Sequence, residues 1–363
     1  MTTVHPLFDV RIFQKQAKTL AGAGHDVSLI VQHSKDETID GIKVIALSKP
    51  KNRFFRVFFL TTRAYRVAVK RNADIYYLHD PELVPVGILL KFHSKRVVYD
   101  VHEDSPAAVL SKLWIYPWLR YIVAKSVAFV EKIGMMFFDG IVTATPVIAE
   151  RFPTSKTITV QNFPILNELV LDNPTPYKER KQIVAYVGNI SELRGAKTMV
   201  EAVGLLPEHL GAQLWLAGVF SPANLGNELK YLCGWKRVEF RGWQSRKDLA
   251  VMLAQVRIGL VLFHKEPNYV PAYPTKLFEY MSAGIPVIAS DFPIWREIVE
   301  GVGCGMLVDP SNPKAIAGAI QWLLEHPEEA EAMGGRGQAA VREWYNWDNE
   351  SKKLLGFCKN ILK

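Results

Sequence analysis

The chain has 363 residues, 49% of them hydrophobic, and a formal net charge of +8. This length and composition allow large buried cores, most simply in two domains, and exclude a disordered or low-complexity protein. Its three cysteines lack the spacing of a zinc site or a disulfide framework, which favours a cytoplasmic, reducing location. No signal peptide is recognised, and charged residues interrupt the most apolar stretch, residues 110–138, before it reaches the roughly 20 residues of a membrane-spanning helix.

Strands and helices alternate along the whole chain. In the first half, apolar runs bounded by turn residues predict strands at 26–31, 41–46, 74–78, 96–100, 140–144 and 157–160. In the second half they predict strands at 182–187, 212–217, 238–240, 258–262 and 286–289. This alternation favours an α/β fold of two doubly wound, Rossmann-like domains.

Prolines in a polar stretch suggest where the two domains meet. We expect an N-terminal domain over residues 1–165, a linker over 166–180 and a second domain from residue 181. Open parallel sheets bind ligands beyond the carboxyl ends of their strands, so two such domains facing each other would enclose a cleft.

The positive charge is concentrated in the first domain. Residues 1–165 contain 22 Lys and Arg against 14 Asp and Glu, whereas the remainder contains 22 of each. Within the acid-free stretch 41–73, four basic residues share one face of a helical wheel: Arg56, Arg63, Arg66 and Lys70. The opposite face is apolar. Such a helix suits an anionic membrane surface or a phosphate-rich substrate; the alternative is a core helix with a solvated basic face. No nucleic-acid recognition motif accompanies it.

Polar clusters follow strands of the first domain. One cluster runs from His79 to Glu82, and the other comprises His102, Glu103 and Asp104. Each histidine alone has a structural alternative, as a hydrogen-bonded residue of the core. Two such clusters at corresponding ends of strands in one sheet favour a functional site.

The second domain has an anion-binding pattern at two strand ends. Its first strand runs into a turn over residues 188–195, which allows close approach of the backbone to a phosphate and presents Arg194. Further on, a short helix begins after Pro274, where first-turn N–H groups and Lys276 favour an anion, and Glu279 offers acceptors for ribose hydroxyls. The alternative for this segment is an ordinary helix start with a surface lysine.

Together these motifs resemble the family 4 retaining glycosyltransferases of GT-B fold. In the second domain the resemblance rests on Tyr186-Val-Gly-Asn189, Arg194-Gly195, Phe240-Arg-Gly-Trp243, the run 274–291 and Trp344-Tyr-Asn-Trp347. In the first domain it rests on residues 4–13, His79-Asp-Pro81 and Tyr99-Asp-Val-His-Glu103, and there it points to enzymes of bacterial surface-polysaccharide assembly.

The resemblance implies a function and a set of roles. The reaction would be transfer of a sugar from a UDP- or GDP-linked donor to a glycan or lipid-linked acceptor, with retention and with no metal or other cofactor. Glu279 would bind the ribose, Arg194 the diphosphate, and His102 the donor sugar or its phosphate. The nucleotide site would also include Gly188, Asn189, Lys276 and Leu277. The candidate catalytic residues are His102, Arg194 and Lys276. The acceptor or sugar side would include His5, Asp9, Arg11, His79, Glu103 and Asp104. The second domain would end at residue 345, and the last helix, 346–363, would cross back onto the first domain.

The sequence departs from this family in three places. Pro271 stands where the family commonly has a second glutamate that touches the donor sugar, and Asn189 stands where an arginine often follows the first glycine. Lys276 is our candidate to supply the missing positive charge. Family members also open with an apolar strand at the centre of the first sheet, whereas here only residues 1–4 precede His5. We therefore expect upstream coding sequence, in frame with Met1, to supply that strand.

Two other functions fit the same pattern. One is a nucleotide-sugar epimerase or hydrolase on the same fold, and the other is a catalytically degenerate nucleotide-binding partner of an assembly complex. For the transferase, the basic face and the aromatic segment 114–118 predict peripheral association with an anionic membrane at the inner face of the cytoplasmic membrane.

Overall fold

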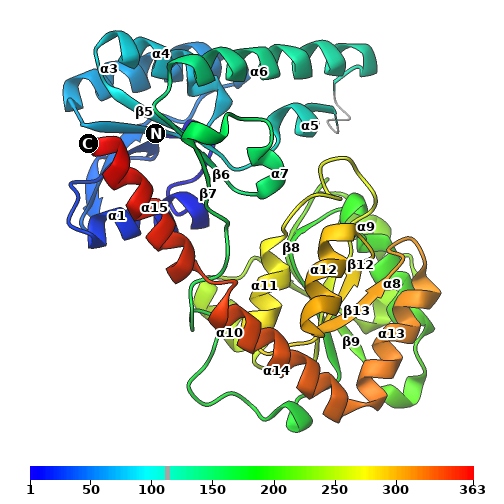
Figure 1. Ribbon diagram of the computed structural model, residues 1–363. Coiled ribbons are helices and arrows are strands. Elements are labelled where there is room, and N and C mark those ends of the chain that lie inside the picture. The colour runs from blue at the N-terminus through cyan, green and yellow to red at the C-terminus, as the bar shows by residue number, and fades with distance from the viewer. Residues whose placement is uncertain (111–114) are drawn as a thin grey trace. The chain divides into compact units, whose positions relative to one another are not determined.

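The computed structural model describes residues 1–110 and 115–363, and these fall into two compact units (Figure 1). Unit 1 comprises Met1–Asn162 and Trp347–Lys363, and unit 2 comprises Phe163–Asn346. The segment expected as a linker instead packs within unit 2, because Leu169 and Tyr177 are both buried in its cores. Trp114, part of the predicted aromatic segment, lies outside the described residues.

Unit 2 is built on a parallel sheet. Its strands are β8 (Ile183–Ile190), β9 (Gln213–Phe220), β10 (Val238–Gly242), β11 (Ile258–Val261), β12 (Val287–Ser290) and β13 (Gly305–Val308). They are arranged in the order β10-β9-β8-β11-β12-β13, and each neighbouring pair is parallel. The chain order reverses between β8 and β11, which is the topological switch point where doubly wound sheets bind ligands.

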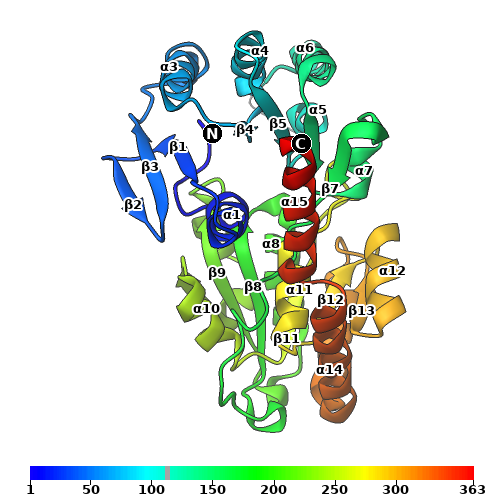
Figure 2. The same ribbon diagram turned by 60° about the vertical axis from the view of Figure 1, so that its left-hand side comes forward.

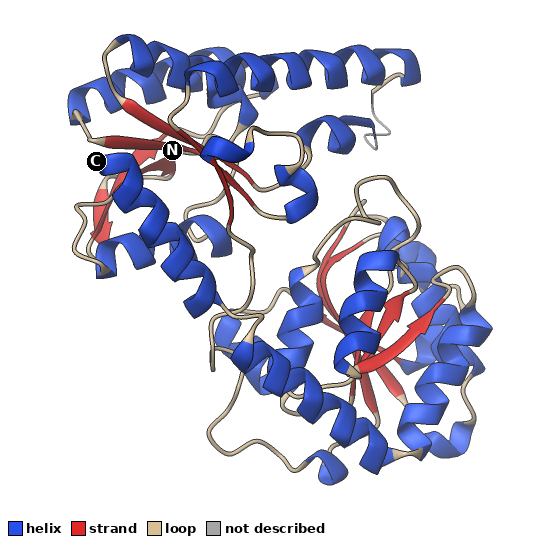
Figure 3. Cartoon of the chain, viewed as in Figure 1, coloured by secondary structure: helices blue, strands red, loops and turns tan. Residues whose placement is uncertain are grey.

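Helices cover both faces of this sheet (Figure 3). They are α8 (Ala196–Leu205), α9 (Leu225–Leu229), α10 (Arg246–Leu253), α11 (Thr275–Ser282), α12 (Pro293–Val302), α13 (Pro313–Glu325) and α14 (Pro327–Glu343). One core contains apolar residues of α10, α11 and α12, and another contains those of α8 and α13. The strands between these cores are buried on both sides, which explains why they are continuous apolar runs in the sequence.

Unit 1 contains separate sheets. A parallel sheet has the order β4 (Ile75–Leu78), β5 (Arg96–Val101), β6 (Gly140–Thr143) and β7 (Thr157–Thr159). Another sheet joins β1 (Ser28–Gln32) in parallel to β3 (Ile42–Leu47), which pairs antiparallel with β2 (Glu37–Ile39). Residues 1–3 lie between β1 and β4: Thr2 N–H donates to Ile30 O at 3.0 Å, and His79 N–H donates to Met1 O at 3.1 Å. This contact is too short to form a full ladder, so the doubly wound sheet predicted for this unit is divided here.

The helices of unit 1 include one that comes from the far end of the chain. In order they are η1 (Val10–Ala17), α1 (Lys18–Gly22), α2 (Arg53–Phe55), η2 (Arg56–Leu60), α3 (Thr61–Arg71), α4 (Val84–Phe92), α5 (Ser105–Leu110), α6 (Pro117–Phe137), α7 (Pro146–Ala149) and α15 (Trp347–Leu362). Helix α15 packs beside η1 and α1 (Figure 2), where Trp347 Nε1 donates to Thr19 Oγ1 at 2.9 Å. None of the helices in the described ranges is long and apolar enough to span a bilayer.

Candidate functional site

The turn after β8 brings the backbone close to the switch point. Gly188 adopts φ 119°, and its carbonyl oxygen packs so closely on Gly218 that a Cβ there would come within 1.8 Å. Gly195 follows at φ 73°, where a Cβ would lie 2.6 Å from the carbonyl oxygen of Leu262. Side chains are therefore excluded at these positions, and the turn that carries Arg194 is held against the end of β11.

Lys276 has a buried ammonium with no partner among the described residues. The residue lies in the first turn of α11 and is 6% exposed. Its Nζ is 3.6 Å from the ring centroid of Tyr186 and 5.2 Å from that of Phe263, and a Cβ on Gly188 would lie 3.4 Å from it. Burial, with the charge of Arg194, holds the pKa of Lys276 well below its usual range, and Glu279 only partly opposes this. Such a group is available to an incoming anion.

Arg194 lies beside one of the same aromatic residues, Phe263. Its guanidinium carbon is 5.2 Å from the ring centroid of Phe263 and 5.8 Å from that of Tyr269. The rings hold the guanidinium in place through cation–π contacts. Phe263 is thus shared by Arg194 and Lys276, and two like charges held close together are best stabilised by an anion between them.

Glu279 is half-buried and already bound to an arginine. Its Oε1 accepts from Arg246 Nη1 at 2.7 Å, and Arg246 Nη2 donates to Glu168 Oε2 at 2.6 Å. This triad comes from α11, the start of α10 and the segment after Phe163. Glu279 was predicted from the sequence, whereas Arg246 and Glu168 were not, because ion pairs between distant segments leave no local sequence pattern.

Two of the predicted nucleotide residues are placed differently from the expectation. The side chain of Leu277 is fully buried in the core, and its N–H donates to Pro274 O at 3.0 Å, so the expected free N–H of this residue is already used. Asn189 is exposed, and its carbonyl oxygen accepts from the Tyr186 hydroxyl at 2.7 Å. Asn189 therefore holds the aromatic ring that covers Lys276.

In unit 1, His5, Asp9 and His102 form a cluster. His5 Nδ1 is 3.4 Å from Asp9 Oδ2, its Nε2 is 3.5 Å from Asp80 Oδ1, and its ring centroid is 4.6 Å from that of His102. Burial opposes protonation of His5, but the hydrogen bond to Asp9 and the carboxylates of Asp80 and Glu103 raise its pKa above the ordinary value. His102 Nδ1 is buried without a hydrogen-bond partner among the described residues, so it too is available to a ligand.

Arg11 and His79, expected on the acceptor side, are instead buried around Asp100. Arg11 donates to Asp100 through Nε at 3.1 Å and Nη2 at 2.6 Å, and His79 Nδ1 lies 3.0 Å from Asp100 Oδ2. Burial lowers the pKa of His79 to about 4 although its hydrogen bond to Asp100 opposes this. Burial would raise the pKa of Asp100, but the Arg11 and His79 contacts hold it far below its usual range. These residues support the loop that carries His5.

Asp104 also has a structural role. Its Oδ1 accepts from Arg151 Nη1 at 3.0 Å and from Ala107 N–H at 3.2 Å, in the first turn of α5. Glu103, by contrast, is exposed. Of the residues predicted for the acceptor side, the structure therefore places His5 and Asp9 together, next to His102 of the predicted catalytic set, with Glu103 close enough to influence His5. Across the described ranges, no group of three or more His, Cys, Asp or Glu side chains is arranged to hold a metal ion.

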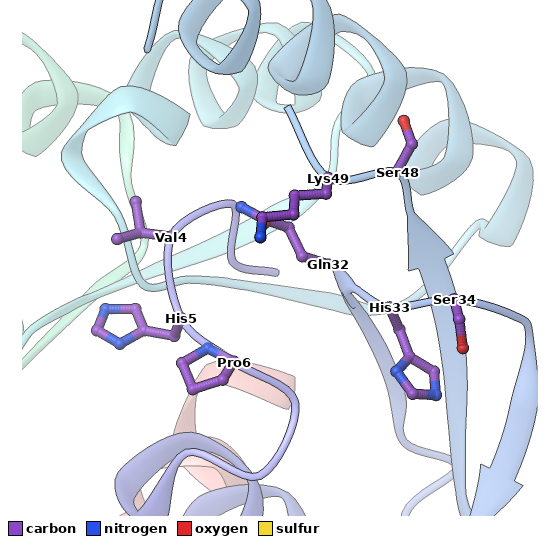
Figure 4. A pocket seen from close by; sticks show the side chains of 8 residues that line it. All are labelled: Val4, His5, Pro6, Gln32, His33, Ser34, Ser48 and Lys49. Atoms are coloured by element: carbon purple, nitrogen blue, oxygen red, sulfur yellow. The ribbon is translucent and has the colours of Figure 1, made fainter. Parts of the chain in front are cut away.

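A pocket opens next to His5, wholly within unit 1 (Figure 4). It has a volume of about 610 Å³ and is lined by Val4, His5, Pro6, Gln32, His33, Ser34, Ser48 and Lys49. It lies at the carboxyl ends of β1 and β3, the position at which parallel strands present ligand-binding residues.

Both units match known protein families. Residues 10–157 match the family described as Glycosyltransferase Family 4, and residues 169–340 match the family described as Glycosyl transferases group 1. An uncharacterized glycosyltransferase of Methanocaldococcus jannaschii is 25% identical over 187 residues, which are 51% of this chain and 47% of that protein. A lipopolysaccharide core biosynthesis glycosyltransferase of Rhizobium meliloti is 28% identical over 216 residues, 56% of this chain and 59% of that one. The matches thus span about half the length of these curated relatives.

Solved structures share the fold across nearly the whole chain. Sucrose-phosphate synthase of Thermosynechococcus elongatus has a TM-score of 0.77 at 21% identity, covering 95% of this chain and 91% of its own. Anabaena HepE in complex with UDP and glucose has a TM-score of 0.73 at 15% identity, covering 95% and 94%. WaaG, a glycosyltransferase involved in lipopolysaccharide biosynthesis, has a TM-score of 0.71 at 16% identity, covering 93% and 92%. The predicted α/β fold of two Rossmann-like domains, the GT-B fold, is confirmed.

Proposed function

Because residues 10–157 match Glycosyltransferase Family 4 and residues 169–340 match Glycosyl transferases group 1, we propose that the chain moves a sugar from a nucleoside diphosphate donor, with retention, to a glycan or lipid-linked acceptor in surface-polysaccharide synthesis. The observation that carries this proposal is the buried amine of Lys276, which has no hydrogen-bond partner among the described residues. It shares the ring of Phe263 with Arg194, which lies in the turn after the first strand of unit 2. HepE, solved with UDP and glucose on a similar fold, supports a uridine nucleotide as the first donor to test.

In the proposed mechanism the cationic residues stabilise the leaving group. When the bond between the anomeric carbon and the diphosphate breaks, negative charge develops on the departing phosphate oxygen, the acceptor oxygen bonds to the same carbon, and the proton of the acceptor hydroxyl passes to the departing phosphate. Arg194 and Lys276 are fixed by aromatic rings before the reaction, so they can bind this charge without reorganising. We propose that they perform here the task that a divalent metal performs in other transferases, and that His102 contacts the donor sugar or its phosphate.

Glu279 is proposed to bind the ribose. Its carboxylate has acceptor capacity beyond the hydrogen bond to Arg246, and the 2′ and 3′ hydroxyls of a ribose are donors that suit it. Arg246, which is itself bound to Glu168, fixes the orientation of the Glu279 carboxylate.

The proposed activity is tested by incubating the enzyme with UDP- and GDP-linked sugars with and without extracts containing glycan or lipid acceptors. The transferase predicts a glycosylated product that requires both substrates. Sugar or epimer released from the donor alone would favour a hydrolase or an epimerase, and binding of nucleotide without any product would favour a degenerate partner.

We further propose peripheral membrane association through α2, η2 and α3. Phe54, Phe58 and Phe59 are 61%, 57% and 58% exposed, and Leu60, Ala64 and Ala68 form the buried stripe instead. Arg56 is bound to Glu82 at 3.0 Å, whereas Arg63, Arg66 and Lys70 are exposed. Exposed aromatic residues next to exposed cations suit an anionic lipid surface.

A further inference from the structure

The wall of the pocket beside His5 is held in place by hydrogen bonds from residues around it and from two of its lining residues, Pro6 and Gln32. Asp80 Oδ2 accepts from Thr2 Oγ1 at 2.8 Å and from Thr3 N–H at 2.5 Å, which fixes the chain just before His5. Gln32 Nε2 donates to Thr3 O, and Pro6 forms a bridge to Gln32 at the end of β1. The wall that carries His5 is therefore set in place before a ligand arrives.

Hydrogen-bond donors predominate among the side chains of the pocket. They come from three segments, residues 4–6, 32–34 and 48–49 (Figure 4). Lys49 is exposed and forms no ion pair within the described part of the chain, and Ser34 and Ser48 add hydroxyls. Arg63 Nη1 donates to Ser48 Oγ at 3.5 Å, which brings a second fixed positive charge to the rim.

The pocket lacks groups that would suit a neutral sugar. No carboxylate is present among its described lining residues, and its rings are the imidazoles of His5 and His33. Each sugar hydroxyl both donates and accepts, so a site for a neutral sugar needs acceptors as well as donors, whereas the oxygens of an ionised phosphate only accept and need donors. An ammonium, hydroxyls and imidazoles at one wall therefore favour an anion with several oxygens.

We propose that this pocket binds the phosphate or diphosphate group of the acceptor, with Lys49 as its principal cation. The inference rests on the proposed glycosyltransferase function and names the chemical class of its acceptor. The phosphate could belong to a lipid-linked acceptor or to a soluble phosphorylated one. The exposed aromatic residues of α2 and η2 follow Lys49 within a few positions, so a phosphate in this pocket would lie near the proposed membrane surface.

The test measures binding of three probes by calorimetry with the donor site filled by saturating UDP. Inorganic pyrophosphate supplies phosphate alone, a short-chain prenyl diphosphate supplies phosphate with a lipid tail, and the matching prenyl alcohol supplies the tail alone. Lys49→Gln should weaken binding of both diphosphates about tenfold or more, because it removes a charged hydrogen bond. Lys49→Arg should restore most of the affinity.

The control is Lys51→Gln, which removes an exposed lysine of the same segment that does not line the pocket. Tighter binding of the prenyl diphosphate than of pyrophosphate would identify a lipid-linked acceptor, and equal binding a soluble one. Lack of diphosphate binding, or equal affinity in wild type and Lys49→Gln, would overturn the proposal. If UDP itself fails to bind, the proposed donor site is wrong. The same probes are then applied to Lys276→Gln and Lys49→Gln, and a loss of diphosphate affinity in Lys49→Gln but not in Lys276→Gln would still show that the pocket binds phosphate.

Discussion

Replacing Lys276 by methionine is expected to stabilise the protein and impair its binding of nucleotide. The ammonium is buried without a hydrogen-bond partner among the described residues, and leaving a buried polar group unsatisfied costs about 1–3 kcal/mol. Methionine has a similar length and suits the aromatic surroundings of Tyr186 and Phe263. The free energy of unfolding should therefore rise by about 1–3 kcal/mol, measured by denaturant titration of the ligand-free protein.

The affinity for UDP should change in the opposite direction. A charged hydrogen bond to phosphate contributes about 1.5–3 kcal/mol, so Lys276→Met should weaken UDP binding by about tenfold or more. Lys197→Met is the matched control, because Lys197 is an exposed lysine on α8 and neither quantity should change. A variant that is less stable and binds UDP normally would refute the interpretation of Lys276 as a ligand group.

The depressed pKa of Lys276 gives this prediction a pH dependence. The unfolded chain binds a proton at Lys276 up to about pH 10.4, whereas the folded, ligand-free protein releases it at lower pH. Stability therefore increases with pH across the interval between the folded and unfolded pKa values, and the advantage of Lys276→Met should shrink as the pH approaches the unfolded value. Diphosphate favours the charged form, so UDP binding should take up protons when it is measured at a pH above the folded pKa of Lys276. Calorimetry in buffers of different ionisation enthalpy measures that uptake, which should disappear in the variant.

Four further predictions concern the other charged networks and the membrane. Glu279→Gln and Arg246→Gln should each weaken UDP binding about tenfold but should affect 2′-deoxy-UDP less, and a double variant no worse than either single one would show that Arg246 acts through Glu279. Arg11→Met leaves Asp100 buried without its main partner, so the free energy of unfolding should fall by about 3–5 kcal/mol in urea. His79 has a folded pKa of about 4, below its unfolded value, so its contribution to stability is lost as the pH falls from about 6.5 toward 4; His79→Gln should remove that part of the pH profile, and an unchanged profile would contradict the assignment. Pelleting with anionic vesicles should decrease when Phe54, Phe58 and Phe59 are changed to Ser and when Arg63, Arg66 and Lys70 are changed to Gln, and equal pelleting of all forms would leave this surface as ordinary solvated protein.

Much of the fold could be predicted from the sequence because parallel strands buried on both faces are short, continuous apolar runs. Strands β8, β11 and β12 are clear examples, each bounded by glycine, proline or polar residues. Strands β2 and β13 were not predicted from the sequence. Strand β2 has only three residues, and β13 is a half-buried edge strand that begins at a glycine, so neither has a strong apolar signal. The division of unit 1 into separate sheets follows from pairing between distant segments, which local patterns do not record.

Candidate site residues could be named from the sequence where a charged residue follows a strand end or lies at a helix start, as with Arg194, Lys276 and Glu279, and the structure places Arg194 and Lys276 beside one ring, that of Phe263. The site was not predictable where charged residues pair across the fold. Arg11 and His79 have the residue types of a ligand site but are buried around Asp100, and the sequence gives no sign of that burial. Arg246 and Glu168 are separated by 78 positions and come together only through the fold.

Two buried lysines differ in whether the Nζ atom has hydrogen-bond partners, and this difference separates a structural lysine from a candidate ligand-binding one. Lys15 in unit 1 is 2% exposed, and its Nζ donates to the side chain of Asn162 at 2.6 Å and to the carbonyl of that residue at 3.2 Å. Lys276 in unit 2 is nearly as buried, yet its Nζ has no hydrogen-bond partner in the described ranges. Burial of an unpaired ammonium is costly, so a protein that satisfies one buried lysine fully and leaves another unsatisfied has a reason for the second. In the proposed function, the diphosphate of the donor would supply the missing partner of Lys276, and the free energy lost by burying the unpaired amine would favour binding of a dianion.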